Sequence, residues 1–217
     1  MWNRIFDMEN PVMRALGAVC DLLVLNLLTA VCCLPVVTCG AALSALFDVT
    51  LRIVRREETR VAGGYFRALR ANFKQGLALG LLFLAAAAVL FADAQIALLY
   101  APPLRVAAVA GALLTGAVAL YAFALQARYE NTVAGTLRNA VSLSVAYFPR
   151  TLAMLAFTVL FWLLCLTFFQ IALPVLLMFG LSLPAYLCAL LLQPVFQRLE
   201  EPAGAEGKKP EETDEAE

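Results

Sequence analysis

Histidine is missing from the 217-residue chain, and none of its six cysteines belongs to a C-x-x-C pair. The sequence therefore lacks the usual zinc-ligand sets and the commonest general base of enzymes. It also has no G-x-S-x-G or phosphate-binding P-loop motif, and its acidic residues do not cluster within an apolar segment. We expect no catalytic residue, no metal site and no cofactor, and a protein that is not an enzyme.

Charged residues are scarce, at 15% of the chain against about 25% in soluble domains, whereas 63% of the residues are apolar. Apolar stretches of about 20 residues, long enough to cross a bilayer, recur along the chain. The sequence predicts an all-α polytopic membrane protein with about five transmembrane helices, amphipathic interfacial helices and a disordered acidic C-terminal tail. The expected spans are 15–37, 76–99, 104–126, 151–169 and 172–193. The last two should form a hairpin, and Pro184 should kink the final span.

The few charges are distributed unevenly between the two ends of the chain. From Glu200 onward there are eight acidic residues and two lysines, which leaves an excess of six positive charges on the remainder. The tail has no aromatic residue and too little apolar surface to offset the entropy cost of ordering. We expect a helical membrane domain at 1–196 and a disordered acidic cytoplasmic tail at 197–217.

Lysine and arginine are concentrated in three segments. Residues 38–75, residues 127–150 and the tail contain thirteen of the sixteen. With five spans all three segments lie on one side of the membrane, and the positive-inside rule makes that side cytoplasmic. This predicts a multi-pass protein with its N-terminus outside and its C-terminus in the cytoplasm.

The first basic segment has helical periodicity. In residues 42–58 apolar side chains repeat at helical spacing, while Ser44, Asp48 and Arg52 share the opposite face, with Asp48 and Arg52 placed for an i,i+4 ion pair. This predicts a helix lying at the membrane interface, and residues 63–76 predict a second, shorter one. Their basic side chains form a candidate surface for anionic lipid or for a partner protein: Arg52, Arg55, Arg56, Arg67, Arg70 and Lys74.

A short internal similarity links ANFKQGLAL at 71–79 to AYFPRTLAM at 146–154. In each case an amphipathic stretch leads into an expected span. A duplicated unit of one helix plus one span would be typical of the repeats in transporters.

Three cysteines lie in NLLTAVCCLPVVTCG, residues 26–40. Cysteine behaves as a small apolar residue in lipid, and the adjacent Cys32 and Cys33 would point about 100° apart on a helix. Pro35 indicates the end of the first span, Thr38 is a plausible N-cap, and Gly40 would free the backbone to turn. We therefore interpret this stretch as a span terminus rather than a redox site.

Asp21 and Asn26 are polar residues of the first expected span. An ionisable group at the centre of a span costs about 2.5–3.5 kcal/mol and suggests a functional site. Asp21, however, lies near the start of its span, where head groups and water can reach it. The pair is a candidate solute or proton site or, alternatively, a helix-packing site.

Four stretches resemble a known family: FDMENPVMR, LLVLNLLTAVCCLPVVTCGAALSALFDVTLRIVRREE, FRALRANFKQG and RYENTVAGTLRNAVSLSVAYFPRTL. Together they resemble the YesL family of bacterial integral membrane proteins, a domain of unknown function (DUF624), over roughly residues 1–196. The resemblance implies a protein of the bacterial cell membrane whose genes often lie beside carbohydrate ABC transporters and two-component sensors. It implies no activity and no site residues.

Two functions remain open. The first is an accessory or regulatory component associated with carbohydrate uptake of the ABC type. Its partners would be the lipid bilayer and, through the basic surface, ABC permease or sensor-kinase subunits, with no nucleic acid. The alternative is a small-solute permease, and few polar residues are available to line its path: Asp21, Asn26, Thr115, Gln126, Thr158 and Gln170.

Overall fold

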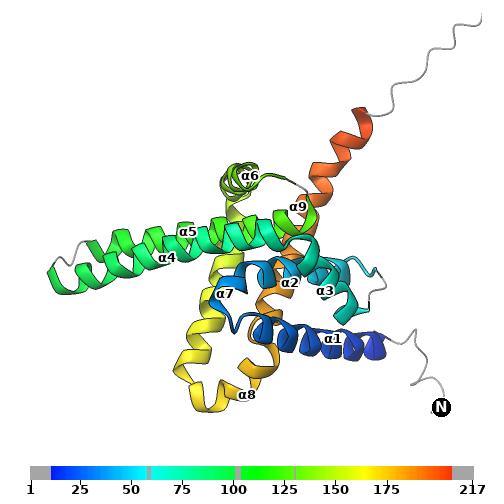
Figure 1. Ribbon diagram of the computed structural model, residues 1–217, viewed down its shortest axis with the longest axis horizontal. Helices are drawn as coiled ribbons and strands as arrows, with labels where there is room; N and C mark the ends of the chain where they lie inside the picture. The colour runs from blue at the N-terminus through cyan, green and yellow to red at the C-terminus, as the bar shows by residue number, and fades with distance from the viewer. Residues whose placement is uncertain (1–10, 58–59, 101–103, 130, 207–217) are drawn as a thin grey trace, which may run out of the picture.

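The computed structural model describes residues 11–57, 60–100, 104–129 and 131–206, and in these the regular elements are all helices (Figure 1). The predicted all-α class is confirmed. The elements in chain order are α1 Pro11–Cys32, η2 Val36–Thr38, α2 Cys39–Val54, α3 Val61–Ala71, α4 Phe73–Tyr100, α5 Leu104–Arg128, α6 Val133–Ala146, α7 Phe148–Thr167, α8 Phe169–Phe179 and α9 Ser182–Glu206.

Helix α2 lies at the centre of the fold and contacts α1, α3, α4, α5 and α9. Its buried side chains include Ala41, Ala42 and Ala45, and Asp48 on the expected polar face is buried as well. Helix α2 is therefore a central helix covered by protein on several sides, and its expected position at the membrane interface stays a prediction. Small side chains let neighbouring helices approach α2 from several directions, so its polar face is covered by protein as well as its apolar face.

Three glycines make the closest helix crossing. A Cβ atom on Gly76 of α4 would lie 2.8 Å from the Cα atom of Ala41, and one on Gly40 of α2 would overlap the backbone of Gly76 and Gly80. Gly76 and Gly80 form a G-x-x-x-G motif, a spacing that allows two helix backbones to touch. Gly40 was expected to turn the chain, but it lies inside α2 and provides this contact instead.

Four of the described helices are long and apolar enough to cross a membrane: Val36–Val54, Phe73–Ile96, Arg105–Arg128 and Phe148–Thr167. The pair Leu173–Phe179 and Ser182–Arg198, bent by 53°, is a fifth if it counts as one span. Several spans are therefore confirmed. The first expected span differs, because the apolar part of α1, Leu16–Cys32, is shorter, and α2 takes its place among the long apolar helices.

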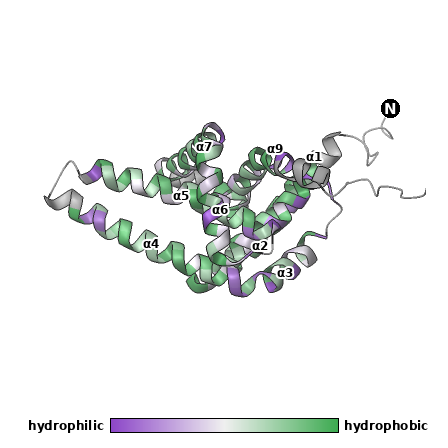
Figure 2. Cartoon of the chain, turned by 90° about the horizontal axis from the view of Figure 1, so that it is seen from above, coloured by the Kyte–Doolittle hydropathy of each residue, from purple (hydrophilic) through white to green (hydrophobic). Residues whose placement is uncertain are grey.

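Helices α4 and α5 form a long antiparallel hairpin that extends well beyond the rest of the molecule, while α7 and α9 run across it (Figure 1). Most residues of the hairpin are hydrophobic along its length (Figure 2). Only 6% of the apolar stretch of α4 is buried, and Phe91 and Val106 near the tip are largely exposed. An apolar surface of this length, about 36 Å over 24 residues, matches the hydrocarbon core of a bilayer.

The two segments linked by internal similarity have the same local structure. Helix α3 ends at Ala71, one residue later α4 begins at Phe73, and likewise α6 ends at Ala146 and α7 begins at Phe148. Asn72 and Tyr147 are the single-residue breaks. The predicted arrangement of a short helix followed by a span is therefore present twice.

The last helix starts after a break rather than a kink. Helix α8 ends at Phe179 and α9 begins at Ser182, with Pro184 in its first turn. Proline lacks the N–H that would bond to the carbonyl of residue 180, so it favours the break at this point. Helix α9 continues past the expected domain boundary at 196 as far as Glu206, and residues 207–217 of the predicted tail lie outside the described residues.

Candidate functional site

Helix α3 is amphipathic, as predicted, and lies against α2. Val61, Tyr65 and Ala68 are buried at the i, i+4 and i+7 positions, and the Tyr65 hydroxyl lies 3.5 Å from the Ala42 carbonyl oxygen. Burial raises the pKa of Tyr65 above its ordinary value, so the hydroxyl remains a donor. This buried stripe turns Arg67 and Arg70 outward.

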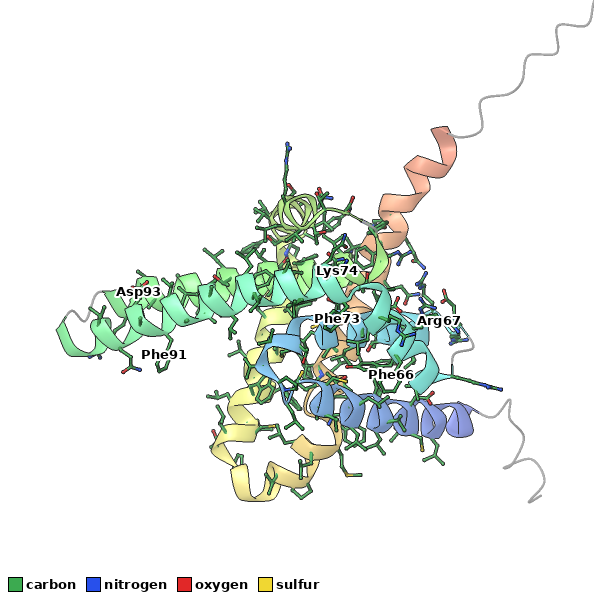
Figure 3. The ribbon with its side chains drawn as sticks, viewed as in Figure 1. Phe66, Arg67, Phe73, Lys74, Phe91 and Asp93 are labelled. Carbon is green, nitrogen blue, oxygen red and sulfur yellow. The ribbon has the colours of Figure 1, made fainter. Side chains whose placement is uncertain are left out.

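The exposed face of α3 and the first turn of α4 enclose a groove of about 1350 Å³, which we call the basic groove. Phe66 and Phe73 are 53% and 40% exposed. In Figure 3 their side chains lie near Arg67 and Lys74, at the opposite end of α4 from Phe91 and Asp93. The groove is lined by Phe66, Arg67, Leu69, Arg70, Ala71, Asn72, Phe73, Lys74 and Gln75.

The cations of the basic groove have no counter-ion in the chain as described. Within those residues no carboxylate forms an ion pair with Arg67, Arg70 or Lys74. The N-terminus of α4 also lies here without an acidic residue in its first turn, and it adds the positive end of the helix dipole. A positive potential beside two exposed phenyl rings suits an acidic ligand that is also partly apolar.

The floor of the groove is fixed to the rest of the protein by amides. The Gln126 side chain, 2% exposed, donates to the Gln75 side-chain oxygen and accepts a 3.5 Å hydrogen bond from Thr136. These three residues belong to α4, α5 and α6. Gln126 therefore holds the start of α4 in place.

The other three residues of the predicted basic surface lie at the end of α2, and two of them pair with a carboxylate. Arg52 pairs with Asp48 at 3.1 Å, which confirms the predicted i,i+4 pair, and Arg55 pairs with Glu57 at 3.3 Å. Arg56 is exposed, with a positive φ of 59° at the end of the helix. The structure thus divides the six predicted residues into two groups. Arg52, Arg55 and Arg56 lie at the end of α2, and Arg67, Arg70 and Lys74 line the basic groove.

Asn26 binds the break between α8 and α9. Its side-chain nitrogen donates to the Leu177 carbonyl at 2.8 Å, and its oxygen accepts from the backbone N–H groups of Leu181 and Ser182 at 2.8 and 3.2 Å. Asp21 is half-buried and shares none of these partners. Asn26 thus caps the start of α9, and the candidate solute or packing site with Asp21 stays a prediction.

The first turn after α1 brings two cysteines together. The Sγ atoms of Cys33 and Cys39 lie 3.4 Å apart. The spacing C-x₅-C across a proline could have indicated this, but helix geometry alone draws attention to the adjacent Cys32 and Cys33. Thr38, the expected N-cap, makes no capping bond and instead donates its hydroxyl to carbonyl oxygens within the turn. Among the described residues no group of three His, Cys, Asp or Glu side chains could hold a metal ion.

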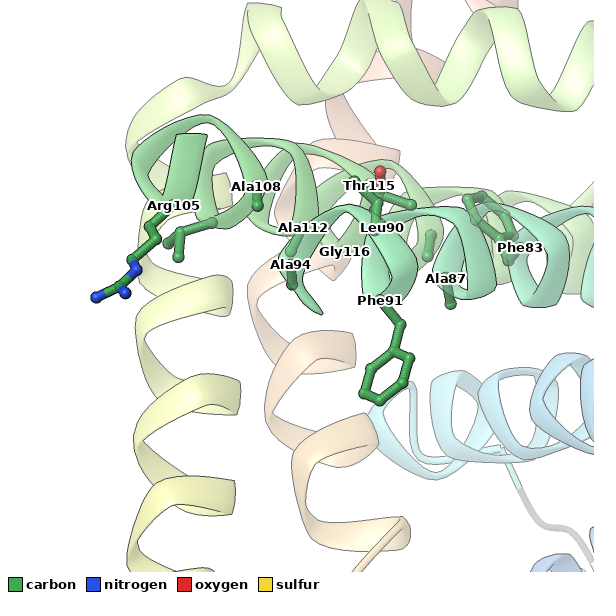
Figure 4. A pocket seen from close by; sticks show the side chains of 12 residues that line it. Phe83, Ala87, Leu90, Phe91, Ala94, Arg105, Ala108, Ala112, Thr115 and Gly116 are labelled. Atoms are coloured by element: carbon green, nitrogen blue, oxygen red, sulfur yellow. The ribbon is translucent and has the colours of Figure 1, made fainter. Parts of the chain in front are cut away.

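A second, apolar groove of about 710 Å³ runs between α4 and α5 near the tip of the hairpin (Figure 4). Ala87, Ala94, Ala108 and Ala112 line much of it, and the Arg105 side chain points away at its end. Small side chains leave space between the two helices that lipid chains can fill. Nothing in its lining distinguishes it from a lipid-facing surface.

Comparison with known proteins identifies one family. Residues 22–94 match the model of the family described as "Protein of unknown function, DUF624", a segment that contains Asn26, the glycine crossing and the basic groove. No curated protein and no solved structure was found to match the chain. The DUF624 part of the resemblance is confirmed over this range, which is shorter than the expected 1–196, while the YesL name stays a prediction. Residues 22–94 are thus similar to the DUF624 family, whose function is unknown.

Proposed function

We propose that this protein is an accessory membrane component that binds an acidic segment of a partner subunit in the basic groove, on the predicted cytoplasmic side. The observation that supports this is the groove itself, where Arg67, Arg70 and Lys74 have no carboxylate partner among the described residues and two phenyl rings are exposed. The resemblance stated above directs the search to permease or sensor-kinase subunits of carbohydrate ABC transport.

The shape of the groove favours a peptide over a small ion. Exposed phenyl rings contribute apolar contact area at binding surfaces, and arginine supplies paired hydrogen bonds to carboxylates. Tyr65 fixes α3 and Gln126 fixes the start of α4 to the rest of the protein, so the groove is preformed. Binding a ligand there has a small entropy cost for ordering the groove.

The permease alternative has less support, because three of its six polar residues have separate partners. Asn26 caps α9, Gln126 bonds to Gln75 and Thr136, and Thr158 lies 3.8 Å from the Cys188 sulfur. Thr115 lines the apolar groove between α4 and α5. These residues give no common polar path in the described part of the chain.

The proposal is tested with Arg67→Gln/Arg70→Gln in native membranes, by mild crosslinking and identification of the subunits that co-purify. Exposed ion pairs contribute about 0.2–1 kcal/mol each, so we expect recovery of a permease or sensor subunit to fall roughly 2- to 30-fold. The matched control is Arg138→Gln/Arg198→Gln, which removes the same charge from exposed positions on α6 and α9. The control should retain the partner.

Two results would contradict the proposal. One is equal loss with both double variants, which would indicate a general effect of charge. The other is a wild-type protein that co-purifies only with anionic lipid, lost in Arg67→Gln/Arg70→Gln, because the groove would then be a lipid site. If the purified protein alone moves a solute into liposomes, the permease alternative replaces the accessory role.

A further inference from the structure

The turn between α1 and α2 holds two thiols in contact. The Sγ atoms of Cys33 and Cys39 are 3.4 Å apart, and the residues between them are Leu34, Pro35, Val36, Val37 and Thr38. A disulfide needs an S–S distance of about 2.05 Å. The sulfurs therefore have little distance to cover.

The contact between the two sulfurs is set by the backbone of the turn, which is held by several hydrogen bonds. The Thr38 hydroxyl lies 2.6 Å from the Cys32 carbonyl oxygen and 2.8 Å from the Pro35 carbonyl oxygen, and the Thr38 N–H bonds to Pro35 at 2.9 Å. The Cys33 N–H still bonds to the Thr29 carbonyl at the end of α1. Both cysteines are thus fixed at their backbones, Cys33 by α1 and Cys39 by the first residues of α2.

The pair is not enclosed by the protein. Cys33 and Cys39 are half-buried, and Leu34 and Val36 between them are mostly exposed. Cys165 and Cys188, in contrast, are buried. The protein therefore covers the thiols of the turn less than it covers the buried thiols, and exposure is one of the conditions for thiol exchange.

We propose that Cys33 and Cys39 form a reversible dithiol–disulfide pair that reacts by exchange with a disulfide-bonded thiol oxidant. One thiolate attacks the oxidant to give a mixed disulfide and releases the first thiol of the oxidant. The second thiolate attacks the mixed disulfide, closes the Cys33–Cys39 bond and releases the second thiol. The pair loses two electrons and two protons, and the oxidant is reduced to two thiols.

The bond would tie the end of α1 to the helix at the centre of the fold. Gly40, next to Cys39, lies in the crossing with Gly76 and Gly80, and Asn26 of α1 holds the α8–α9 break. Oxidation therefore stiffens the turn that connects Asn26 on α1 to the glycine crossing on α2. The inference is independent of the proposed function and of the basic groove.

The test counts thiols in the full-length protein. Reduced protein in nanodiscs is incubated with oxidised glutathione, quenched with N-ethylmaleimide in SDS so that buried thiols also react, and weighed intact. We expect two fewer alkylated thiols than in the reduced protein, with no glutathione adduct, and recovery of all six after reduction. Cys33→Ser and Cys39→Ser should each form a stable glutathione adduct instead of losing two thiols.

Cys20→Ser and Cys165→Ser serve as matched controls, because each removes one thiol outside the pair and should still close the bond. A second probe, phenylarsine oxide, requires two thiols within reach and should protect two thiols in wild type but none in Cys33→Ser. The proposal is overturned if wild type keeps all six thiols or gives glutathione adducts only. It is also overturned if Cys33→Ser loses two thiols as readily as wild type.

Discussion

Asn26 uses both ends of its amide on backbone groups more than 150 residues away. Two N–H groups at the start of α9 and one carbonyl of α8 depend on it. In an environment without water, such groups have few other partners. Asn26 of α1 therefore stabilises the break between α8 and α9, which Pro184 favours.

Replacing Asn26 by Leu should destabilise the protein by about 1–3 kcal/mol, because buried backbone groups lose their partners. Asn26→Asp should cost less, since it keeps the oxygen that accepts from Leu181 and Ser182. Asp21→Asn is the control on the same helix and should change little. Circular dichroism during thermal unfolding in detergent measures the difference, and equal stability of Asn26→Leu and wild type would contradict the structural role.

At the level of elements, α2 and α4 pack closely because glycines without side chains lie where the two helices cross. The crossing at Gly40, Gly76 and Gly80 brings the two backbones into contact over one G-x-x-x-G motif. Glycine inside a helix costs about 1 kcal/mol relative to alanine. The close contact offsets that cost. Whether a glycine-to-alanine substitution raises or lowers the free energy of unfolding therefore depends on the position of the glycine.

Gly76→Ala should destabilise the protein, because its Cβ would lie 2.8 Å from the Ala41 Cα atom. Gly17→Ala, on α1 with nothing within 4 Å, should instead be neutral or stabilise by up to about 1 kcal/mol. Unfolding in detergent–SDS mixtures, followed by tryptophan fluorescence, compares the two variants. Opposite signs support the crossing, whereas stabilisation by both substitutions would mean that α2 and α4 are not in contact here.

Local composition was enough to predict the spans on α4, α5 and α7, the amphipathic α3 and the Asp48–Arg52 pair. Each depends on residues close in sequence. The central position of α2 could not be predicted, because periodicity does not distinguish lipid from a neighbouring helix. The G-L-A-L-G motif at 76–80 was a usable signal for the crossing, while the partners of Asn26 and the Cys33–Cys39 contact required the folded turn and the distant helices.

For the basic groove, the sequence identified the cations but not their arrangement. Arg67, Arg70 and Lys74 were grouped with Arg52 and Arg55 because all lie in one segment. The carboxylates that pair with Arg52 and Arg55 are Asp48 and Glu57, which lie close to them in sequence at the end of α2. Phe66 is exposed because it follows the buried Tyr65 by one position on α3 and so points about 100° away from it, and Phe73 lies beyond the break at Asn72.

At the level of the whole molecule, Lys74 and Asp93 mark opposite ends of the α4–α5 hairpin (Figure 3). If the hairpin crosses the bilayer, the two residues should be accessible from different sides. The predicted orientation places Lys74 and the C-terminus in the cytoplasm and Asp93 and the N-terminus outside.

This topology is tested by single cysteines in a background where all six native cysteines are Ala or Ser, which should still insert. With an impermeant maleimide on intact cells, Asp93→Cys and Asn3→Cys should be labelled, and Lys74→Cys and Ala205→Cys should be protected until the cells are lysed. Labelling of both chain ends alike would require an even number of spans. Labelling of Lys74→Cys and Asp93→Cys alike would mean that α4 does not cross the membrane.

The central position of α2 also affects how the chain is assembled during synthesis. Helix α2 emerges from the ribosome early, but one of the helices that cover it, α9, begins at Ser182. Until α9 arrives, that side of α2 faces lipid or the insertion machinery. The last helix therefore completes the shielding of one of the first, and a chain that stops before Ser182 would leave one side of α2 uncovered and open to quality-control proteases.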